Sequence, residues 1–152
     1  MCQFISGVIT KDKTLFDLDT DSHEDLIKKA GLDDKTKSPN FVRVELIPKD
    51  NNVFNHTQDN WQLRIDQDFK PDWFSEKFAE DEMRKALKQV IDERFIIGQK
   101  IKELNKGRYF IKNSEIEKLC GSIFVQLLNK SKVGEMRGSS KVGEMWGSSK
   151  VG

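Results

Sequence analysis

The sequence has few residues of the kinds that disulfide-bonded, metal-binding or membrane-spanning proteins need. Its 152 residues include two cysteines, two histidines and three prolines. Cys2 and Cys120 lie far apart and form no CxxC spacing, so we expect free thiols rather than a disulfide framework. No stretch approaches the roughly 18 consecutive apolar residues of a membrane helix, so no membrane partner is expected. The N-terminus has no basic region before its apolar residues, which predicts a cytoplasmic protein without a cleavable signal peptide.

The charges are nearly balanced over the whole chain but are unevenly placed along it. Residues 1–98 contain 15 Lys and Arg against 20 Asp and Glu, whereas residues 99–152 contain 11 against 5. All three prolines lie in the first part, and eight of the ten glycines lie from Gly98 onward. This change in composition predicts two domains, 1–98 and 99–152.

The first part contains the strand and helix patterns of an α+β domain, an antiparallel sheet with two helices. Two β-rich runs joined by the polar turn KDK predict a hairpin, and alternation of apolar and polar residues predicts two more strands at 41–47 and 61–67. A helix is expected within 19–32, with Asp21 or Ser22 as its N-cap and Gly31 at its end. A long helix is expected within 71–95, where its length would allow a break.

The second part contains a tandem repeat with a nine-residue period. SKVGEMRGS at 131–139 is followed by SKVGEMWGS at 140–148 and by SKVG, and the two full copies differ only in Arg137 and Trp146. The spacing recurs more weakly upstream, at Ser114 with Ile116 and at Ser122 with Phe124. Short periods are typical of β-solenoids, in which a unit buries its apolar residues only when neighbours stack on it. A disordered Ser/Gly/Lys tail is the alternative, but it would not need Val, Met and Trp in a fixed phase.

We therefore predict a short β-solenoid over 99–152, with the identical repeats at 131–152. Val133 and Met136 are three residues apart, so they would face opposite sides of a straight strand. Either the chain bends at Gly134 or both faces are covered, and a glycine at this place in each copy favours the bend. The Gly-Ser pairs at 138–139 and 147–148 should form the corners, and the valines of all copies should fall in one column.

Several segments resemble a group of uncharacterised phage and prophage-borne proteins. They are MCQFIS at 1–6, DSHEDLI at 21–27, FVRVE at 41–45 and the repeat tail. The resemblance implies an N-terminal α+β domain, a tail of short tandem repeats and an origin in a mobile element. It transfers no catalytic residue, because we know of no established activity for that group.

Cys2 suggests an enzymatic alternative. Removal of Met1 would leave a cysteine whose own α-amino group could act as the base, as in N-terminal nucleophile hydrolases. The class II glutamine amidotransferases resemble the chain only in the Met-Cys start, because they continue with glycine where this chain has Gln3. A cysteine that acts as a small hydrophobe in the first strand, beside Phe4, is the simpler interpretation.

No other residues form a pattern that predicts a catalytic or metal site. His23 and its acidic neighbours do not face one another on a helix, so they are better explained as a capping segment. His56 lies in a polar loop. The cysteines and histidines lack the paired spacing of zinc ligands, so we expect no metal and no cofactor.

Four charged residues alternate along the two predicted strands of the sheet, namely Arg43, Glu45, Arg64 and Asp66. Opposite charges on paired strands can stand across from one another, which indicates a solvated sheet face. A charged patch for a partner, or a carboxylate pair for hydrolysis, is the functional alternative.

The repeat presents one lysine and one glutamate per copy. A solenoid would align them in rows about 5 or 10 Å apart, depending on whether one or two repeats complete a turn. The acidic row would largely neutralise the basic row, so nucleic acid is not expected as a partner. The candidate binding residues are Lys132, Lys141, Lys150, Arg137, Trp146, Glu135 and Glu144.

These observations predict a non-enzymatic binding or assembly protein of phage origin, whose solenoid mediates self-association or partner binding. Solenoids that remain monomeric usually cover their terminal rung, and SKVG shows no such cap, so we expect a homo-oligomer formed through the repeat end. The alternatives are a hydrolase that uses Cys2 and a phage-encoded inhibitor of a host protein that uses the acidic N-terminal surface.

Overall fold

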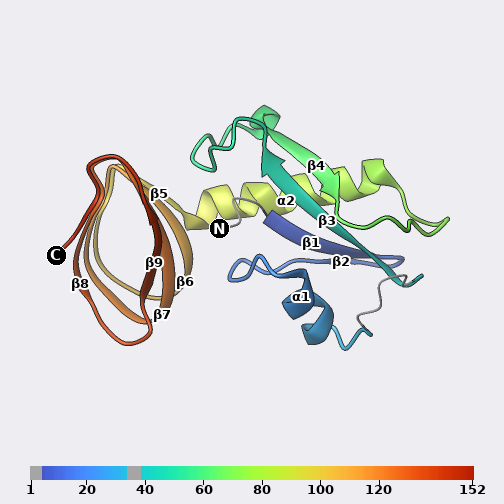
Figure 1. Ribbon diagram of the computed structural model, residues 1–152, viewed down its shortest axis with the longest axis horizontal. Coiled ribbons are helices and arrows are strands. Elements are labelled where there is room, and N and C mark those ends of the chain that lie inside the picture. The colour runs from blue at the N-terminus through green and yellow to red at the C-terminus, as the bar shows by residue number, and fades with distance from the viewer. Residues whose placement is uncertain (1–4, 34–38) are drawn as a thin grey trace. The chain divides into compact units, whose positions relative to one another are not determined.

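A computed structural model describes residues 5–33 and 39–152. The chain divides into two compact units, one ending at Val90 and one beginning at Ile91. The first unit is α+β and the second is a β-solenoid, as predicted (Figure 1). Neither helix of the described residues has the length and hydropathy that a membrane span requires.

The first unit is a four-stranded antiparallel sheet with two helices. Its strands are β1 (Ile5–Thr10), β2 (Thr14–Leu15), β3 (Phe41–Pro48) and β4 (Trp61–Ile65), in the order β2-β1-β3-β4. The helices are α1 (His23–Lys29) and α2 (Glu76–Arg94), and a short 3-10 turn, η1 (Gln58–Asn60), precedes β4. The hairpin, the two longer strands and both helices are confirmed, and α2 is one continuous helix.

The alternation of side chains along β1 places the two helices on opposite faces of the sheet. Val8 packs against Leu26 and Ile27 of α1. The neighbouring Gly7 points to the other face, where a Cβ would come within 2.3 Å of the sulfur of Met83 in α2. Glycine at this position therefore allows α2 to pack directly on the strand.

Helix α1 begins and ends where the sequence predicts. The Ser22 side chain accepts a hydrogen bond from the Asp25 backbone N–H at 3.2 Å, which satisfies one of the free donors of the first turn. Gly31 has a φ of 67° and follows the last residues of the helix, where a left-handed conformation favours glycine. This cap places His23 at the first position of α1.

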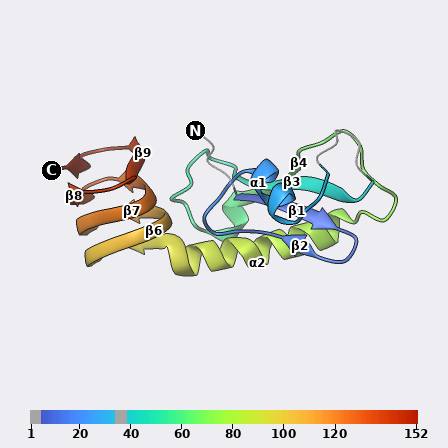
Figure 2. The same cartoon turned by 90° about the horizontal axis from the view of Figure 1, so that it is seen from below.

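The second unit consists of parallel strands coiled into rungs. They are β5 (Phe95–Ile97), β6 (Lys100–Lys112), β7 (Glu115–Leu128), β8 (Lys132–Met136), β9 (Lys141–Met145) and β10 (Lys150–Val151). Strand β8 pairs with the first half of β7, and β9 pairs with its second half. The long strands β6 and β7 therefore each make two sides of one rung, and Figure 2 shows these rungs stacked.

Two repeats complete one turn, so the expected single column of valines is wrong. Val151 pairs with Val133, whereas Val142 lies on the other side of the coil and pairs with Val125. The physical reason is that nine residues supply one strand and one corner, which is only half of the circumference. The phase inferred upstream also shifts by one residue, because Val125 rather than Phe124 is the counterpart of Val142.

The expected bend at Gly134 is confirmed. Val133 is buried and Met136 packs against the same apolar cluster, although the two residues are three apart. A Cβ on Gly134 would lie 2.7 Å from the carbonyl oxygen of Glu117 in the neighbouring strand. Glycine therefore permits both the bend and the close approach of the adjacent rung.

The corners of the rungs use residues that accept a left-handed backbone. Gly138 has a φ of 68° and Gly147 a φ of 66°, which confirms the two predicted corners. Asn113 and Asn129 have φ values of 50° and 60° at corresponding corners upstream. Among residues with a side chain, asparagine is one of the few that adopts this conformation readily.

The serine that opens each repeat closes the corner through its hydroxyl. Ser131 is fully buried. Its Oγ lies within hydrogen-bond distance of two carbonyl oxygens, that of Leu128 at 2.7 Å and that of Ile111 at 3.2 Å. Ser149 makes the same bond to the carbonyl of Trp146 at 2.9 Å. The serine column thus gives carbonyl groups at the corners a side-chain donor.

Candidate functional site

The solenoid brings charged side chains of successive rungs into columns. One column contains Lys100, Glu115, Lys132 and Lys150, in that order. The Glu115 carboxylate lies between two lysines, with its oxygens 3.6 Å from Nζ of Lys100 and 3.6 Å from Nζ of Lys132. The charge therefore alternates from rung to rung until Lys132 and Lys150, which are neighbours in the ladder.

The seven residues predicted to bind partners are divided between the two sides of the coil and its corners. Those in β8 and β10 are Lys132, Glu135 and Lys150, those in β9 are Lys141 and Glu144, and those at the corners are Arg137 and Trp146. The guanidinium of Arg137 lies 2.5 Å from the Glu135 carboxylate, and this hydrogen bond raises the pKa of Arg137. Trp146 is half-buried, and its backbone N–H donates to Leu127 at 3.0 Å.

A groove of about 540 Å³ lies beside the lysine column. Its charged lining residues are Lys100, Glu115, Lys130, Lys132 and Lys150. Four lysines against one glutamate make the groove basic. The lining comes from several rungs, so only the coiled fold assembles this surface.

The rung formed by β9 and β10 exposes apolar side chains at positions that are buried one rung earlier. Met145 is 44% exposed, whereas its partner Leu127 in β7 is 1% exposed. Val151 is 39% exposed, whereas its partner Val133 in β8 is 1% exposed. These side chains belong to the interior columns, so a strand added to this rung would cover them.

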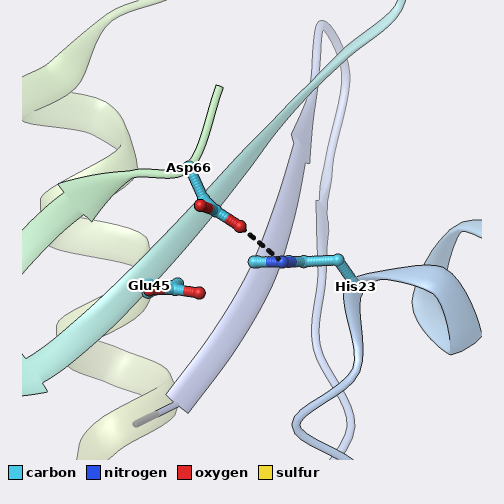
Figure 3. Close-up of side chains that lie close together, drawn as sticks. All are labelled: His23, Glu45 and Asp66. Atoms are coloured by element: carbon cyan, nitrogen blue, oxygen red, sulfur yellow. Dashed lines mark ion pairs between the residues drawn. The ribbon is translucent and has the colours of Figure 1, made fainter. Parts of the chain in front are cut away.

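A second cluster lies within the α+β unit and consists of His23, Glu45 and Asp66 (Figure 3). His23 begins α1, Glu45 lies in β3, and Asp66 directly follows β4. The backbone N–H of Asp66 donates to the carbonyl of Arg43 at 2.9 Å, which continues the sheet past the end of β4. One nitrogen or oxygen atom of each of the three side chains lies within 4.8 Å of the others.

Both ring nitrogens of His23 have defined neighbours. Nε2 lies 2.9 Å from the carbonyl oxygen of Val44, and a carbonyl only accepts, so Nε2 carries a proton and donates it. Nδ1 faces the Asp66 carboxylate, 3.4 Å from Oδ2. The His23 side chain is 10% exposed, so the fold holds the ring in this orientation.

Glu45 is a buried charge, with 3% of its side chain exposed. Burial raises the pKa of Glu45, because water no longer solvates the carboxylate, and the attraction of Arg64 opposes this shift. Arg64 stands opposite Glu45 in the register of β3 and β4 and forms an ion pair with its Oε2. The expectation of a solvated sheet face is therefore wrong at Glu45, where His23 and the start of α1 lie over the strand (Figure 3).

Sequence reasoning missed this cluster because it compared His23 only with its neighbours in the chain. The actual partners come from β3 and from the residue that follows β4, and the fold of the sheet brings both beside α1. The signal in the sequence was the alternation of charge on two strands that were predicted to pair. It marked Glu45 and Asp66 but gave no reason to place a histidine between them.

The enzymatic hypothesis concerns Cys2, which lies outside the described residues. Cys120, in β7, is a free, half-buried thiol, as predicted. Comparisons with protein-family models, with curated proteins and with solved structures find no match to this chain. We therefore argue function from the geometry of the solenoid and of the histidine cluster.

Proposed function

We propose that this chain is a binding and assembly protein whose solenoid joins two copies into a dimer. The observation that carries the proposal is that one copy of the repeat pairs with another. The backbone N–H of Lys150 donates to Ser131 at 2.9 Å, and that of Gly152 donates to Val133 at 2.7 Å. This pairing within the chain is parallel. We infer that the same sequence also accepts an antiparallel strand when a second copy supplies it.

The apolar side chains of this rung favour the association. Met145 and Val151 are each more than one third exposed, whereas their partners in the preceding rung, Leu127 and Val133, are each 1% exposed. Covering both with a partner strand would contribute about 1 kcal/mol each, since roughly half of a fully buried side chain is at stake. A partner strand would also add backbone hydrogen bonds along the same edge.

The charges of the repeat are complementary in a two-fold arrangement. In an antiparallel pair of β9 strands centred between Val142 and Gly143, Lys141 of each copy stands opposite Glu144 of the other. Such cross-strand pairs of opposite charge contribute about 0.2–1 kcal/mol each. A two-fold contact uses the same patch on both copies and closes at a dimer.

Sedimentation velocity over a series of protein concentrations tests the proposal. We expect the 152-residue protein to form a dimer at micromolar concentrations, and Met145→Lys to make it monomeric. Phe78→Lys is the matched control, because Phe78 is 46% exposed on α2 and should leave the dimer intact. A wild-type protein that stays monomeric at high micromolar concentration, or a Met145→Lys variant that still forms the dimer, would refute the proposal.

The basic groove favours a second candidate function, the binding of an acidic segment of another protein. Four lysines line it, and the single glutamate already pairs with two of them. A fluorescent poly-glutamate peptide should bind the wild-type protein more tightly than a Lys130→Glu, Lys150→Glu variant, whereas a poly-lysine peptide should not bind. Equal anisotropy with the two proteins would exclude the groove as the binding surface.

The phage origin implied by the resemblance, and the cytoplasm as compartment, belong to the same proposal. Support for the origin comes from the four resembling segments. Sequencing the region around the gene tests the origin. Phage genes on both sides would support it, whereas a chromosomal operon without phage genes would contradict it.

A further inference from the structure

The cluster of His23, Glu45 and Asp66 has the dimensions of a metal site. Two ligand atoms that each lie about 2.0–2.1 Å from a tetrahedral zinc ion are about 3.3–3.4 Å apart. The 3.4 Å between Nδ1 of His23 and Oδ2 of Asp66 equals this spacing. It is longer than the roughly 2.7–3.2 Å of an ordinary N–H···O hydrogen bond.

The orientation of His23 also fits a ligand. A metal-binding histidine commonly donates its other ring N–H to a backbone carbonyl or a carboxylate, which fixes the tautomer. Here Nε2 donates to the carbonyl of Val44 at 2.9 Å, so the lone pair of a neutral ring lies on Nδ1. A neutral ring places that lone pair beside the carboxylate of Asp66, and either a proton on Nδ1 or a metal ion between the two removes their repulsion.

Glu45 completes the donor set from the interior of the protein. One of its oxygens pairs with Arg64, and a carboxylate can bind a metal ion through the other. Its burial makes the negative charge costly, and a metal ion nearby would offset that cost. Asp66, by contrast, is 46% exposed and leaves a path for the ion and for a water molecule.

From this geometry we propose that His23, Glu45 and Asp66 bind one Zn²⁺ ion, with water as the fourth ligand. One imidazole and two carboxylates suit zinc, whereas Cu²⁺ and Ni²⁺ prefer square or tetragonal sites. The site belongs to the α+β unit and uses no residue of the repeat. Its presence or absence is therefore independent of the proposed dimer.

Titration of the metal-free 152-residue protein with Zn²⁺ in a calorimeter tests the site. We expect one ion per chain, with affinity reduced about tenfold or more in His23→Gln and in Asp66→Asn. His56→Gln is the matched control, because the chain has only two histidines, and its affinity should equal that of the wild type. Cys120→Ser serves as the control for binding by a thiolate.

Two spectroscopic measurements identify the ligands. Co²⁺ in the same site should give the intense visible bands of a tetrahedral ion, without the near-ultraviolet bands of cobalt bound to sulfur. In nitrogen-resolved NMR, Zn²⁺ should shift the Nδ1 resonance of His23 and leave both nitrogens of His56 in place. If His23→Gln fails to fold, Asp66→Asn decides the question, since that side chain is half-exposed.

Arg64→Gln separates a metal site from a purely structural ion network. Removing this cation leaves Glu45 with its full charge for the metal, so we expect zinc to bind several-fold more tightly. A structural network predicts no change in zinc binding. The proposal is wrong if millimolar Zn²⁺ gives no one-to-one binding, if His56→Gln or Cys120→Ser abolishes it, or if Arg64→Gln leaves the affinity unchanged.

Discussion

Gly134 offers a direct test of how closely the rungs of the solenoid pack. Its backbone is outside the left-handed region, so alanine causes no conformational strain there. The new Cβ would instead lie 2.7 Å from the carbonyl oxygen of Glu117, a backbone atom that cannot rotate away. Gly98 is the opposite case, because its φ is 65° and no atom lies within 4 Å of the added Cβ.

The magnitudes follow from these two effects. Overpacking lowers the free energy of unfolding by about 1–3 kcal/mol. Replacing glycine by alanine also restricts the unfolded chain, which raises the free energy of unfolding by about 0.4–1 kcal/mol. Gly134→Ala should therefore lower the free energy of unfolding by about 1–2 kcal/mol. Gly98→Ala should cost about 1 kcal/mol, from the left-handed penalty of about 1–2 kcal/mol less the same gain. Gly138 combines a φ of 68° with a contact of 3.1 Å, so Gly138→Ala should cost most, about 2–4 kcal/mol.

Urea unfolding followed by circular dichroism measures the three losses, and hydrogen exchange localises them. In Gly134→Ala, faster exchange is expected at the backbone amides of Lys132 and Arg137. They donate to the carbonyls of Ser114, just before β7, and of Leu119, within β7, both at 2.8 Å. In Gly98→Ala these amides should exchange as in the wild type. If Gly134→Ala is as stable as the wild type and its exchange is unchanged, the close approach of the rungs is wrong.

Three further predictions concern single side chains. The pKa of Glu45 is raised in the folded state, so its contribution to stability is fully present below the unfolded pKa near 4.5 and is lost as the pH rises through the folded pKa. Between pH 4 and pH 8, with EDTA present, the urea midpoint of Glu45→Gln should therefore fall less than that of the wild type. A steeper fall in the variant would contradict this. Ser131→Ala should lower the free energy of urea unfolding by about 1–2 kcal/mol, because its buried hydroxyl closes a corner. Ser140→Ala should cost less, because the hydrogen bond from Ser140 to Arg137 is exposed. Equal losses would argue against a role for the buried hydroxyl of Ser131. Ser22→Ala should cost about 0.5–2 kcal/mol through the lost N-cap, seen as a lower melting temperature, and an unchanged value would mean that α1 does not depend on it.

The secondary structure of the first unit could be predicted because its signals are local. Ser22 and Gly31 mark the ends of α1 through hydrogen bonds and φ values that involve only nearby residues. The strands follow from alternation, which is a property of one segment at a time. The helix α2 was predicted from its apolar period, and the possible break did not occur because nothing in its interior interrupts the hydrogen bonding.

The sequence also determined that the repeats form a solenoid and that the strand bends at Gly134. Val133 and Met136 are both apolar and are three residues apart. A bend at the glycine between them lets both side chains face the interior. The number of repeats in a turn was not determined in this way. It depends on where the coil closes, and the pairing of Val151 with Val133 shows that closure takes two repeats.

The histidine cluster was decided by the tertiary structure alone. Glu45 in β3 and Asp66, just after β4, lie close together because of the register of the two strands. His23 joins them only because α1 packs on that face of the sheet. The same packing removes Glu45 from water and raises its pKa. Local sequence sets the conformation of each segment, whereas proximity between distant side chains depends on strand order and packing, which arise only when the whole chain folds.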